Sequence, residues 1–268
     1  MLIRLVQMCT TNSKTKNINN IIDHLNSQNV SIGEMICFPE NSLFLRATRK
    51  DPVETFTLND PEIGLLKDWC VNKQVFMHLG AIPLAIDNKV YNASVRISMD
   101  GKIESQYKKI HLFDVDVEGQ VSIRESDTYT AGTKESIFTY DGWKIGESIC
   151  YDLRFPALYL SYAQKEVDAI MVPSSFLHVT GKAHWEVLLR ARAIETQSYI
   201  IAPAQGGVHM GLHRTWGHSM VVDPWGEIIA EIKTETDLPQ SVVVELDKSK
   251  IESVRKQIPL RLHRKPIV

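Results

Sequence analysis

Cysteine is scarce in this sequence, and its four copies are scattered along 268 residues. They are Cys9, Cys37, Cys70 and Cys150, and no two of them form the C-x-x-C spacing of zinc sites and redox motifs. Scattered thiols are typical of proteins from reducing compartments. The pattern supports neither a disulfide framework nor a four-cysteine zinc site, so each thiol has to be explained singly.

Long apolar runs and an excess of one charge are also missing. No stretch approaches the roughly 18–20 apolar residues that span a bilayer. The N-terminal MLIRLVQ carries an arginine inside a short apolar run, which predicts a first strand and not a signal peptide. The formal net charge is −2, so no bulk field draws the chain to nucleic acid or to an anionic membrane. We therefore expect a cytoplasmic protein that binds neither.

Repeats, low-complexity segments and linkers rich in proline, glycine and serine are absent as well. We therefore expect one domain over residues 1–268. Strand-like runs alternate with runs of helical spacing, which predicts an α/β fold with mixed sheets and outer helices. The expected strands are 2–8, 34–38, 75–83, 169–176, 199–205 and 241–247, and the expected helices are 18–25, 61–73, 181–196, one from Pro156 and one at the C-terminus. Hairpins are expected at Asp100-Gly101, at Asp141-Gly142 and at residues 223–226.

Three groups of reactive side chains fall at the ends of expected strands. Glu40 follows EMICF, Lys108 and Lys109 follow KIESQY, and Cys150 follows KIGESI. Strand ends are where binding sites collect in layered α/β proteins. A lone buried cysteine is often inert packing, and a glutamate or lysine at a strand end is often surface charge. The three groups together raise the alternative that they share a site.

Cys150 has two of the features that a thiol nucleophile needs. Pro156 suits the first turn of a following helix, so Cys150 is expected near a helix N-terminus, where partial positive charge favours the thiolate. The backbone N–H of Tyr151 is a candidate donor to the oxyanion that forms when a thiol attacks a carbonyl. These features do not by themselves identify a nucleophile.

Several segments, taken in order, resemble the nitrilase or carbon–nitrogen hydrolase superfamily. They are FPEN (38–41), YKKIHLFDVDV (107–117), RESDTYTAG (124–132), GESICYDLRFP (146–156), TGKAHWEVLLRARAIETQSY (180–199) and WGHSMVVDPWGEI (216–228). The resemblance runs nearly end to end. It implies a four-layer α-β-β-α sandwich, a Glu40–Lys109–Cys150 triad with Glu125 as a fourth catalytic residue, and no metal or organic cofactor. It also implies a homodimer, for which the helix at 181–196 and the basic C-terminal segment are candidate contacts.

Within the superfamily, HLFDVDV, RESDTY and TGKAHWEVLLRARAIETQ look most like deaminated-glutathione amidases. That branch cleaves an amide of a glutathione whose amino group has become a keto group, and the products are 2-oxoglutarate and cysteinylglycine. The resemblance leaves open an ω-amidase acting on 2-oxoglutaramate, an N-carbamoyl amidohydrolase, and a catalytically weak interaction protein. A carboxylate-bearing small molecule is the expected substrate of the deaminated-glutathione amidase and of the ω-amidase.

Three substrate contacts are predicted. Arg154 is a candidate clamp for a carboxylate, since guanidinium binds carboxylate in a bidentate manner, or it pairs with Asp152 or Glu195. Phe176 and Trp185 are candidates for the pocket wall, and Trp185 has helical spacing that also suits a core position.

The sequence departs from the branch at two places. Val208 stands where the branch commonly has arginine in Q-C-G-R-H, and the pair Glu147-Ser148 is more polar than is usual before the cysteine. His209 and His213 have H-x3-H spacing, but no second ligand pair accompanies them, so we expect a glycine-rich loop near the pocket mouth and no zinc site.

Overall fold

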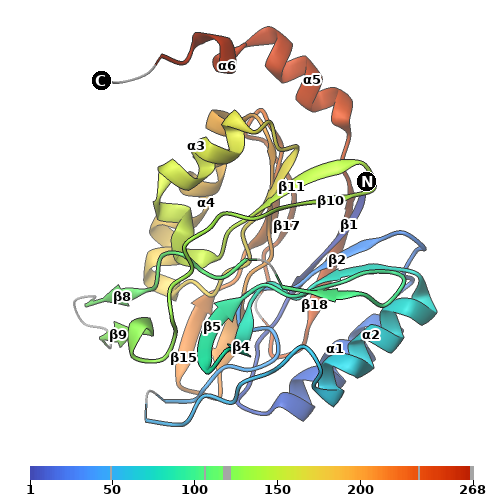
Figure 1. The fold of residues 1–268 in the computed structure, drawn as a ribbon, viewed down its shortest axis with the longest axis vertical. Helices are drawn as coiled ribbons and strands as arrows, with labels where there is room; N and C mark the ends of the chain where they lie inside the picture. Colours follow the sequence, from blue (N-terminus) through green and yellow to red (C-terminus); the bar gives the residue numbers. More distant parts are fainter. Residues whose placement is uncertain (49, 106, 117–121, 235, 266–268) are drawn as a thin grey trace.

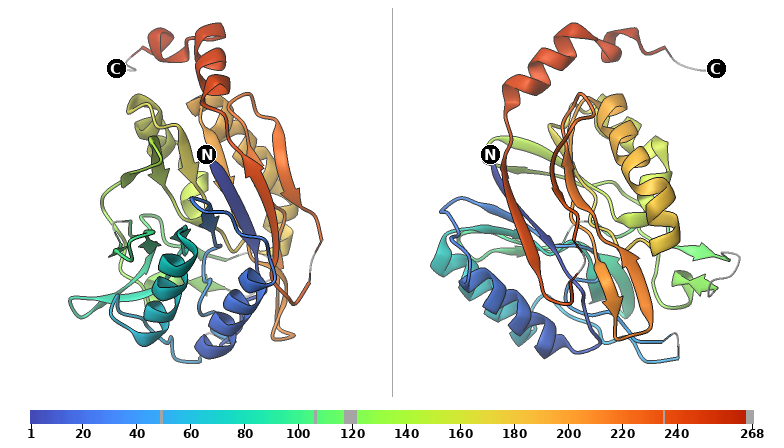
Figure 2. Two further views of the ribbon diagram at one scale, coloured as in Figure 1. Left: turned by 90° about the vertical axis from the view of Figure 1, so that its right-hand side faces the viewer. Right: turned by 180° about the vertical axis from the view of Figure 1, so that it is seen from behind.

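The computed structural model describes residues 1–268 except 49, 106, 117–121, 235 and 266–268. It contains two six-stranded mixed sheets that face each other, with helices on both outer faces (Figures 1 and 2). The first sheet has the order β18-β1-β2-β3-β6-β7, with bounds Gln240–Glu245, Leu2–Gln7, Met35–Cys37, Phe76–His78, Arg96–Ile97 and Ile103–Glu104. The second has the order β10-β11-β12-β13-β16-β17, with bounds Ile137–Tyr140, Trp143–Glu147, Ala169–Met171, Tyr199–Ala202, Ser219–Val222 and Ile228–Ile232.

Four helices form the outer layers. They are α1 (Lys14–Asn26), α2 (Pro61–Lys73), α3 (Pro156–Gln164) and α4 (His178–Thr196). The helices α1 and α2 bury apolar side chains with one face of the first sheet, and α3 and α4 do so with one face of the second. A third apolar cluster fills the space between the sheets, and it takes Ile3 and Leu5 from β1 while Val6 points to the outer cluster. This alternation is the period of a strand buried on both faces.

The predicted hairpins are confirmed. The strands β10 and β11 pair antiparallel around Asp141 and Gly142, both of which have positive φ, as the tightest hairpin turns require. The strands β6 and β7 pair around Asp100-Gly101, and β16 and β17 pair around residues 223–226. In that last turn the Asp223 carboxylate accepts the backbone N–H groups of Trp225 and Glu227, each at 2.9 Å.

Several expected segments differ from the structure. The strands expected at 169–176 and 199–205 are shorter, since β12 ends at Met171 and β13 ends at Ala202. The expected strand at 75–83 is two strands, β3 and β4 (Ile82–Ile86), because the chain turns at Gly80 (φ +66°). A Cβ at Gly80 would lie 2.3 Å from the Phe38 and Pro39 carbonyl oxygens, so only glycine allows this approach. The expected glycine-rich loop after Gln205 is a hairpin of β14 (Gly206–His209) and β15 (His213–Trp216).

The remaining elements lie around this double-sheet body. The strand β5 (Lys89–Ala93) pairs with β4, and β8 (Asp114–Val115) pairs with β9 (Ile123–Arg124). Two short 3-10 helices, η1 (Glu125–Asp127) and η2 (Cys150–Arg154), follow β9 and β11. The C-terminal helices α5 (Lys248–Gln257) and α6 (Leu260–His263) extend from one end of the body (Figures 1 and 2).

Candidate active site

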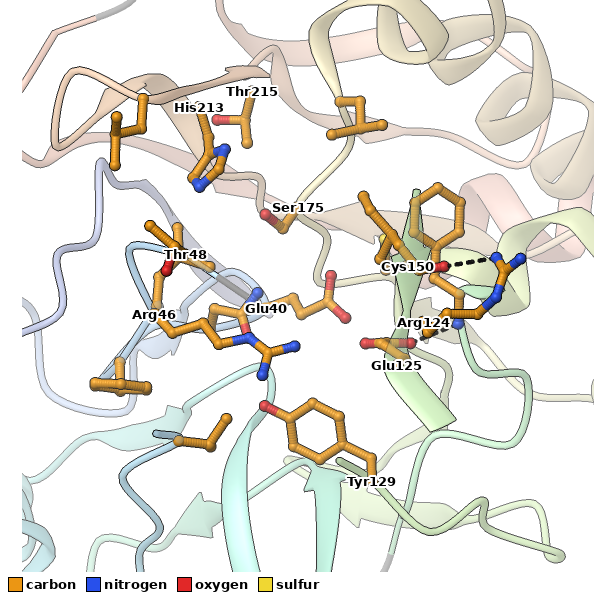
Figure 3. A pocket seen from close by; sticks show the side chains of 18 of the residues that line it. Glu40, Arg46, Thr48, Arg124, Glu125, Tyr129, Cys150, Ser175, His213 and Thr215 are labelled. Atoms are coloured by element: carbon orange, nitrogen blue, oxygen red, sulfur yellow. Dashed lines mark hydrogen bonds between the residues drawn. The ribbon is translucent and has the colours of Figure 1, made fainter. Parts of the chain in front are cut away.

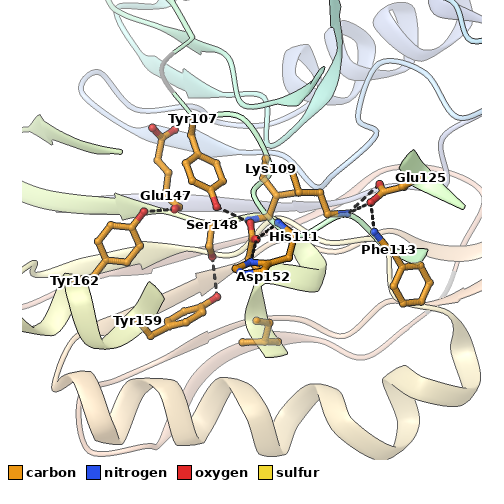
Figure 4. Close-up of polar contacts among 12 residues, drawn as sticks. Tyr107, Lys109, His111, Phe113, Glu125, Glu147, Ser148, Asp152, Tyr159 and Tyr162 are labelled. Atoms are coloured by element: carbon orange, nitrogen blue, oxygen red, sulfur yellow. Dashed lines mark hydrogen bonds and ion pairs between the residues drawn. The ribbon is translucent and has the colours of Figure 1, made fainter. Parts of the chain in front are cut away.

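The ammonium group of Lys109 lies between two carboxylates. Its Nζ is 2.8 Å from Glu40 Oε1 and 2.8 Å from Glu125 Oε2. Lys109 is 1% exposed, and Glu40 is 2% exposed. Lys108, its neighbour, turns the other way and places its Nζ 4.0 Å from the centre of the Tyr91 ring. The structure thus brings the predicted Glu40, Lys109 and Glu125 into one cluster, of which Figure 4 shows Lys109 beside Glu125.

The charges in this cluster hold one another in place. Burial alone would lower the pKa of Lys109, but the carboxylates of Glu125 and Glu40 outweigh burial and raise it well above its ordinary value. The pKa of Glu125 is raised by burial and by the Glu40 charge, although Lys109 opposes the rise. Lys109 therefore stays an ammonium group at neutral pH and can stabilise negative charge beside it.

Asn92 and Phe113 orient the two carboxylates. The Asn92 side-chain amide donates to Glu40 Oε1 at 2.8 Å and to Glu125 Oε1 at 3.2 Å. The backbone N–H of Phe113 donates to Glu125 Oε2 at 2.6 Å. The Lys109 backbone N–H in turn donates to the Asn92 carbonyl oxygen at 2.8 Å, so β5 holds the lysine main chain directly and its side chain through the two carboxylates.

Cys150 lies three residues after the end of β11, in a backbone conformation that is uncommon for a residue with a side chain. Its φ is +47°, and its N–H donates to the Pro173 carbonyl oxygen at 2.9 Å. Such left-handed positions cost energy for residues other than glycine and concentrate at functional sites. The sharp turn carries the thiol to the cavity that Glu40 and Lys109 also line, while the residue stays 7% exposed.

The buried Asp152 carboxylate stabilises this turn. Its Oδ2 accepts the Ile149 backbone N–H at 3.0 Å and the Tyr107 hydroxyl at 2.6 Å. Its Oδ1 accepts the backbone N–H of His111 at 2.9 Å and lies 2.7 Å from the His111 Nδ1. Tyr107 and His111 flank Lys109 in sequence, so one carboxylate ties the cysteine turn to the lysine segment (Figure 4).

The thiol of Cys150 is neutral at rest, contrary to the thiolate that proximity to a helix N-terminus predicts. Burial and the Glu40 charge raise its pKa well above the ordinary value. Lys109 and a backbone hydrogen bond from Ser175 lower the pKa, but they do not outweigh burial. The residue begins the short helix η2, which is too brief to supply a strong dipole. A thiol in this setting needs a nearby base to take its proton.

A cavity of about 320 Å³ opens beside the cluster (Figure 3). Cys150, Glu40, Lys109 and Glu125 line its floor, and Ser175 and Tyr129 stand beside them. Further lining residues come from the segment after Glu40, from β9 and from β15; they include Phe44, Arg46, Thr48, Val53, Arg124, His213, Arg214 and Thr215. The cavity therefore combines an apolar wall with several cationic groups.

The three predicted substrate contacts do not line this cavity. Trp185 is fully buried in the core under α4, and its Nε1 donates to the His218 carbonyl oxygen at 2.8 Å. Phe176 packs on Trp185 with ring centres 4.9 Å apart, so both aromatic predictions are corrected to core positions. Arg154 lies over the Phe176 ring at 5.3 Å, and its Nη1 is 3.1 Å from His184 Nδ1. The two predicted partners of Arg154 bind elsewhere. Asp152 accepts hydrogen bonds from Tyr107 and His111, and Glu195 pairs with Arg192 at 2.7 Å.

The histidines of the β14–β15 hairpin have structural partners. His209 is fully buried, with Nδ1 2.9 Å from the Thr10 carbonyl oxygen and Nε2 2.7 Å from the Thr215 hydroxyl. In the ranges that the structure describes, no group of three or more His, Cys, Asp or Glu side chains is placed to hold a metal ion. Val208 is 47% exposed and pairs across the hairpin with Arg214, which does line the cavity.

Sequence reasoning missed four residues of the site: Asn92, Asp152, Ser175 and Arg46. Asn92 lies in a strand and Ser175 in a serine pair, where nothing marks them as unusual. Asp152 stood inside the quoted motif CYDLRF and was available as a signal. Arg46 lies in the segment after FPEN, whose approach to the cavity depends on the fold alone.

Comparison with known proteins identifies the family of the chain. Residues 2–256 match the carbon–nitrogen hydrolase family. The deaminated glutathione amidase of Bos taurus is 37% identical over 276 residues, which cover 99% of this chain and 82% of that protein. The enzyme of the same name from Dictyostelium discoideum is 34% identical, over 98% of this chain and 93% of that protein.

Solved structures agree with the fold. The crystal structure of Saccharomyces cerevisiae Nit3, a member of branch 10 of the nitrilase superfamily, matches with a TM-score of 0.79 at 28% identity. The match covers 97% of this chain and 94% of Nit3. The chain thus belongs to the carbon–nitrogen hydrolase family and is an enzyme that hydrolyses carbon–nitrogen bonds. The predicted family and the predicted sandwich of mixed sheets are confirmed.

Proposed function

We propose that Cys150 is the nucleophile of an amidase in which Glu40 is the general base and Lys109 stabilises the oxyanion. The observation that carries this proposal is the meeting of a buried thiol, a buried carboxylate and a buried ammonium group on one cavity. Glu125 is the fourth residue, and it orients Lys109 and keeps it charged. Residues 1–268 act as a single carbon–nitrogen hydrolase domain.

The first half of the reaction forms a thioester. Glu40 takes the proton of the Cys150 thiol as the sulfur attacks the amide carbonyl, and the tetrahedral oxyanion is stabilised by the Lys109 ammonium and the Tyr151 backbone N–H. Glu40 then returns the proton to the departing amine, and the carbon–nitrogen bond breaks. Because the thiol of Cys150 is neutral at rest, the base is needed in this step.

The second half restores the enzyme. Glu40 takes a proton from water, the hydroxide adds to the thioester carbonyl, and the same donors stabilise the second oxyanion. Collapse of this intermediate breaks the carbon–sulfur bond, releases the carboxylic acid and returns the proton to sulfur. The carboxylate of Glu40 therefore acts four times in one turnover, and its hydrogen bonds to Lys109 and Asn92 hold it in one position.

The substrate we propose is deaminated glutathione, cleaved to 2-oxoglutarate and cysteinylglycine. Both amidases named above act on that compound according to their names. The cavity supports an anionic substrate, because four cationic side chains line it against two carboxylates. An ω-amidase acting on 2-oxoglutaramate is the second candidate, and the same positive charge favours it. The catalytic set of Glu40, Lys109, Glu125 and Cys150 argues against a protein that only binds a partner, because such a protein does not need these four residues.

The substrate proposal predicts a clear preference. With the purified protein, kcat/KM for release of 2-oxoglutarate is expected to be higher from deaminated glutathione than from 2-oxoglutaramate. The reaction is rapidly quenched and the protein is digested. Mass spectrometry should then show a 2-oxoglutaryl adduct on the peptide that contains Cys150. A higher kcat/KM for 2-oxoglutaramate would replace the first candidate with the second. Failure on both compounds would reject this substrate class.

We also propose that the enzyme is a cytoplasmic homodimer. The helix α4 leaves Val179, Val187 and Ile194 between 48% and 68% exposed, and these residues repeat at spacings that keep them on one helix face. No helix in the described part of the chain is long and apolar enough to cross a membrane. An apolar helix face of this kind suits a second copy of the chain.

Light scattering tests the dimer. The expected mass at micromolar concentration is twice the 30.4 kDa of one chain, and Val187→Glu on α4 is expected to shift the mass toward that of one chain. Val187 is 68% exposed, so this substitution puts a charge on the apolar face without disturbing the core. A strictly monomeric wild-type protein would contradict the proposal.

A further inference from the structure

The cavity concentrates positive charge on a protein whose formal net charge is −2. Its cationic lining residues are Arg46, Lys109, Arg124 and Arg214, and its carboxylates are Glu40 and Glu125. Both carboxylates already bind Lys109. The three arginines therefore give the cavity its excess charge, and they differ in what they contact.

Arg46 projects from the segment after Glu40 into the cavity, with its guanidinium group toward the hydroxyl of Tyr129 (Figure 3). Its Nη1 donates to the neutral Thr128 hydroxyl at 3.3 Å. Within the described residues, no carboxylate lies at ion-pair distance from Arg46. Burial and the Glu125 charge raise the pKa of Tyr129, and the positive charge of Arg46 opposes that rise.

The other arginines are placed less well. Arg124 pairs with Asp116 at 2.6 Å, so its charge is partly neutralised. Arg214 is exposed on β15 at the rim. Arg154, the arginine that the sequence suggested, lies outside the cavity lining and contacts His184. Arg46 alone combines half-burial, a position facing the catalytic floor, and a charge without a carboxylate partner among the described residues.

We propose that Arg46 is a specificity-determining residue that binds a carboxylate of the substrate. Guanidinium suits this role because its planar donors match the two carboxylate oxygens. The Tyr129 hydroxyl and the Thr48 side chain, which line the same side of the cavity, supply further polar groups. This contact lets the enzyme reject neutral amides. A neutral substrate would displace water from the Arg46 guanidinium without offering it a carboxylate, and this desolvation costs binding free energy. This inference rests on the proposed function.

The test couples a protein change to a substrate change. Arg46→Gln is expected to lower kcat/KM for deaminated glutathione by about 10- to 100-fold, mainly through KM, because the group binds the substrate and does not react. The loss should shrink strongly on whichever analogue lacks the bound carboxylate: deaminated glutathione amidated at its glycine end, or the neutral diamide glutaramide. Arg46→Lys should recover part of the loss. Lys67→Gln, which removes one exposed positive charge on α2 outside the cavity lining, is the control.

A second measurement does not depend on turnover. Alkylation of Cys150 by anionic iodoacetate and by neutral iodoacetamide is followed by peptide mass spectrometry, and the ratio of the two rates is compared between variants. Arg46→Gln is expected to reduce this ratio several-fold, and Lys67→Gln is expected to leave it unchanged. If no amide is hydrolysed but the ratio falls, the proposed substrate is wrong and the clamp stands. An unchanged ratio, or an equal loss of kcat/KM on anionic and neutral amides, overturns the proposal.

Discussion

Replacing Cys150 with alanine is expected to lower kcat by at least about 1000-fold, because removal of a covalent nucleophile leaves only the binding and oxyanion contributions of the site. The other three cysteines, Cys9, Cys37 and Cys70, do not line the cavity. Among the other cysteines, Cys37 and Cys70 are fully buried, and burial raises the pKa of Cys70 to about 12. The measurement is release of 2-oxoglutarate under substrate saturation, with intact-mass spectrometry to show the absence of an acyl adduct.

The matched control is Cys70→Ala, which removes a buried thiol of α2. Cys70 belongs to the apolar cluster on the outer face of the first sheet. It is expected to keep kcat within a factor of about two, because Cys70 only packs in the core. Activity in Cys150→Ala above a tenth of the wild-type value would contradict the thioester mechanism.

Glu40→Gln separates the base from the thiol. The negative charge of Glu40 helps to raise the pKa of Cys150, so removing that charge should lower the pKa and leave Lys109 to favour the thiolate. Alkylation of Cys150 by iodoacetamide should then begin at a lower pH than in the wild type, while hydrolysis is lost. An onset at the same or a higher pH would show that Glu40 does not act on the thiol.

The strand ends that carry Glu40, Lys109 and Cys150 were predictable because each follows a short apolar run with a clear boundary. The resemblance to the family supplied their roles. What the sequence could not show is how the three are held. Asn92 bonds two carboxylates that lie 52 and 33 residues away from it, and this contact exists only after the first sheet and β5 have assembled.

The β14–β15 hairpin shows why a local pattern misled. Its three glycines and polar residues resemble a loop, yet His209 is fully buried and bonds the Thr10 carbonyl 199 residues away. Similarly, Trp185 lies inside the motif at 180–199 and Phe176 lies shortly before it. Sequence position alone cannot tell a residue of the pocket wall from a residue of the core. Long-range packing decides both cases, and a single sequence carries no record of it.

Glu147, the first residue of the polar pair before the cysteine, has a structural explanation. Glu147 is 1% exposed at the end of β11, and its carboxylate accepts the hydroxyls of Ser94 and Ser136, each at 2.6 Å. It also lies 3.2 Å from His78 Nε2 and 3.8 Å from Arg96 Nη1. These partners belong to or adjoin β3, β6 and β10, so one buried carboxylate joins the two sheets just below the cysteine turn.

The second large effect is therefore expected on the free energy of unfolding, and it depends on the Glu147 carboxylate. Burial alone would raise the pKa of Glu147, but hydrogen bonds from His78 and Ser136 and the charge of Arg96 outweigh it and lower the pKa from 4.5 to about 2. A carboxyl group whose pKa falls on folding stabilises the native state above its ordinary pKa. That contribution is present at neutral pH and is lost as the pH falls from about 4.5 through about 2.

Glu147→Gln is expected to reduce the free energy of unfolding at pH 7 by about 3–5 kcal/mol, because it leaves the buried Arg96 without its buried counter-charge. Urea denaturation followed by tryptophan fluorescence measures the loss, and the difference from wild type should narrow below pH 4. Glu104→Gln is the matched control, since Glu104 also contacts Arg96, at 3.6 Å, but is 35% exposed in its side chain. Its loss should stay below about 1 kcal/mol. Equal losses in the two variants would mean that the inter-sheet carboxylate contributes no more than a surface ion pair.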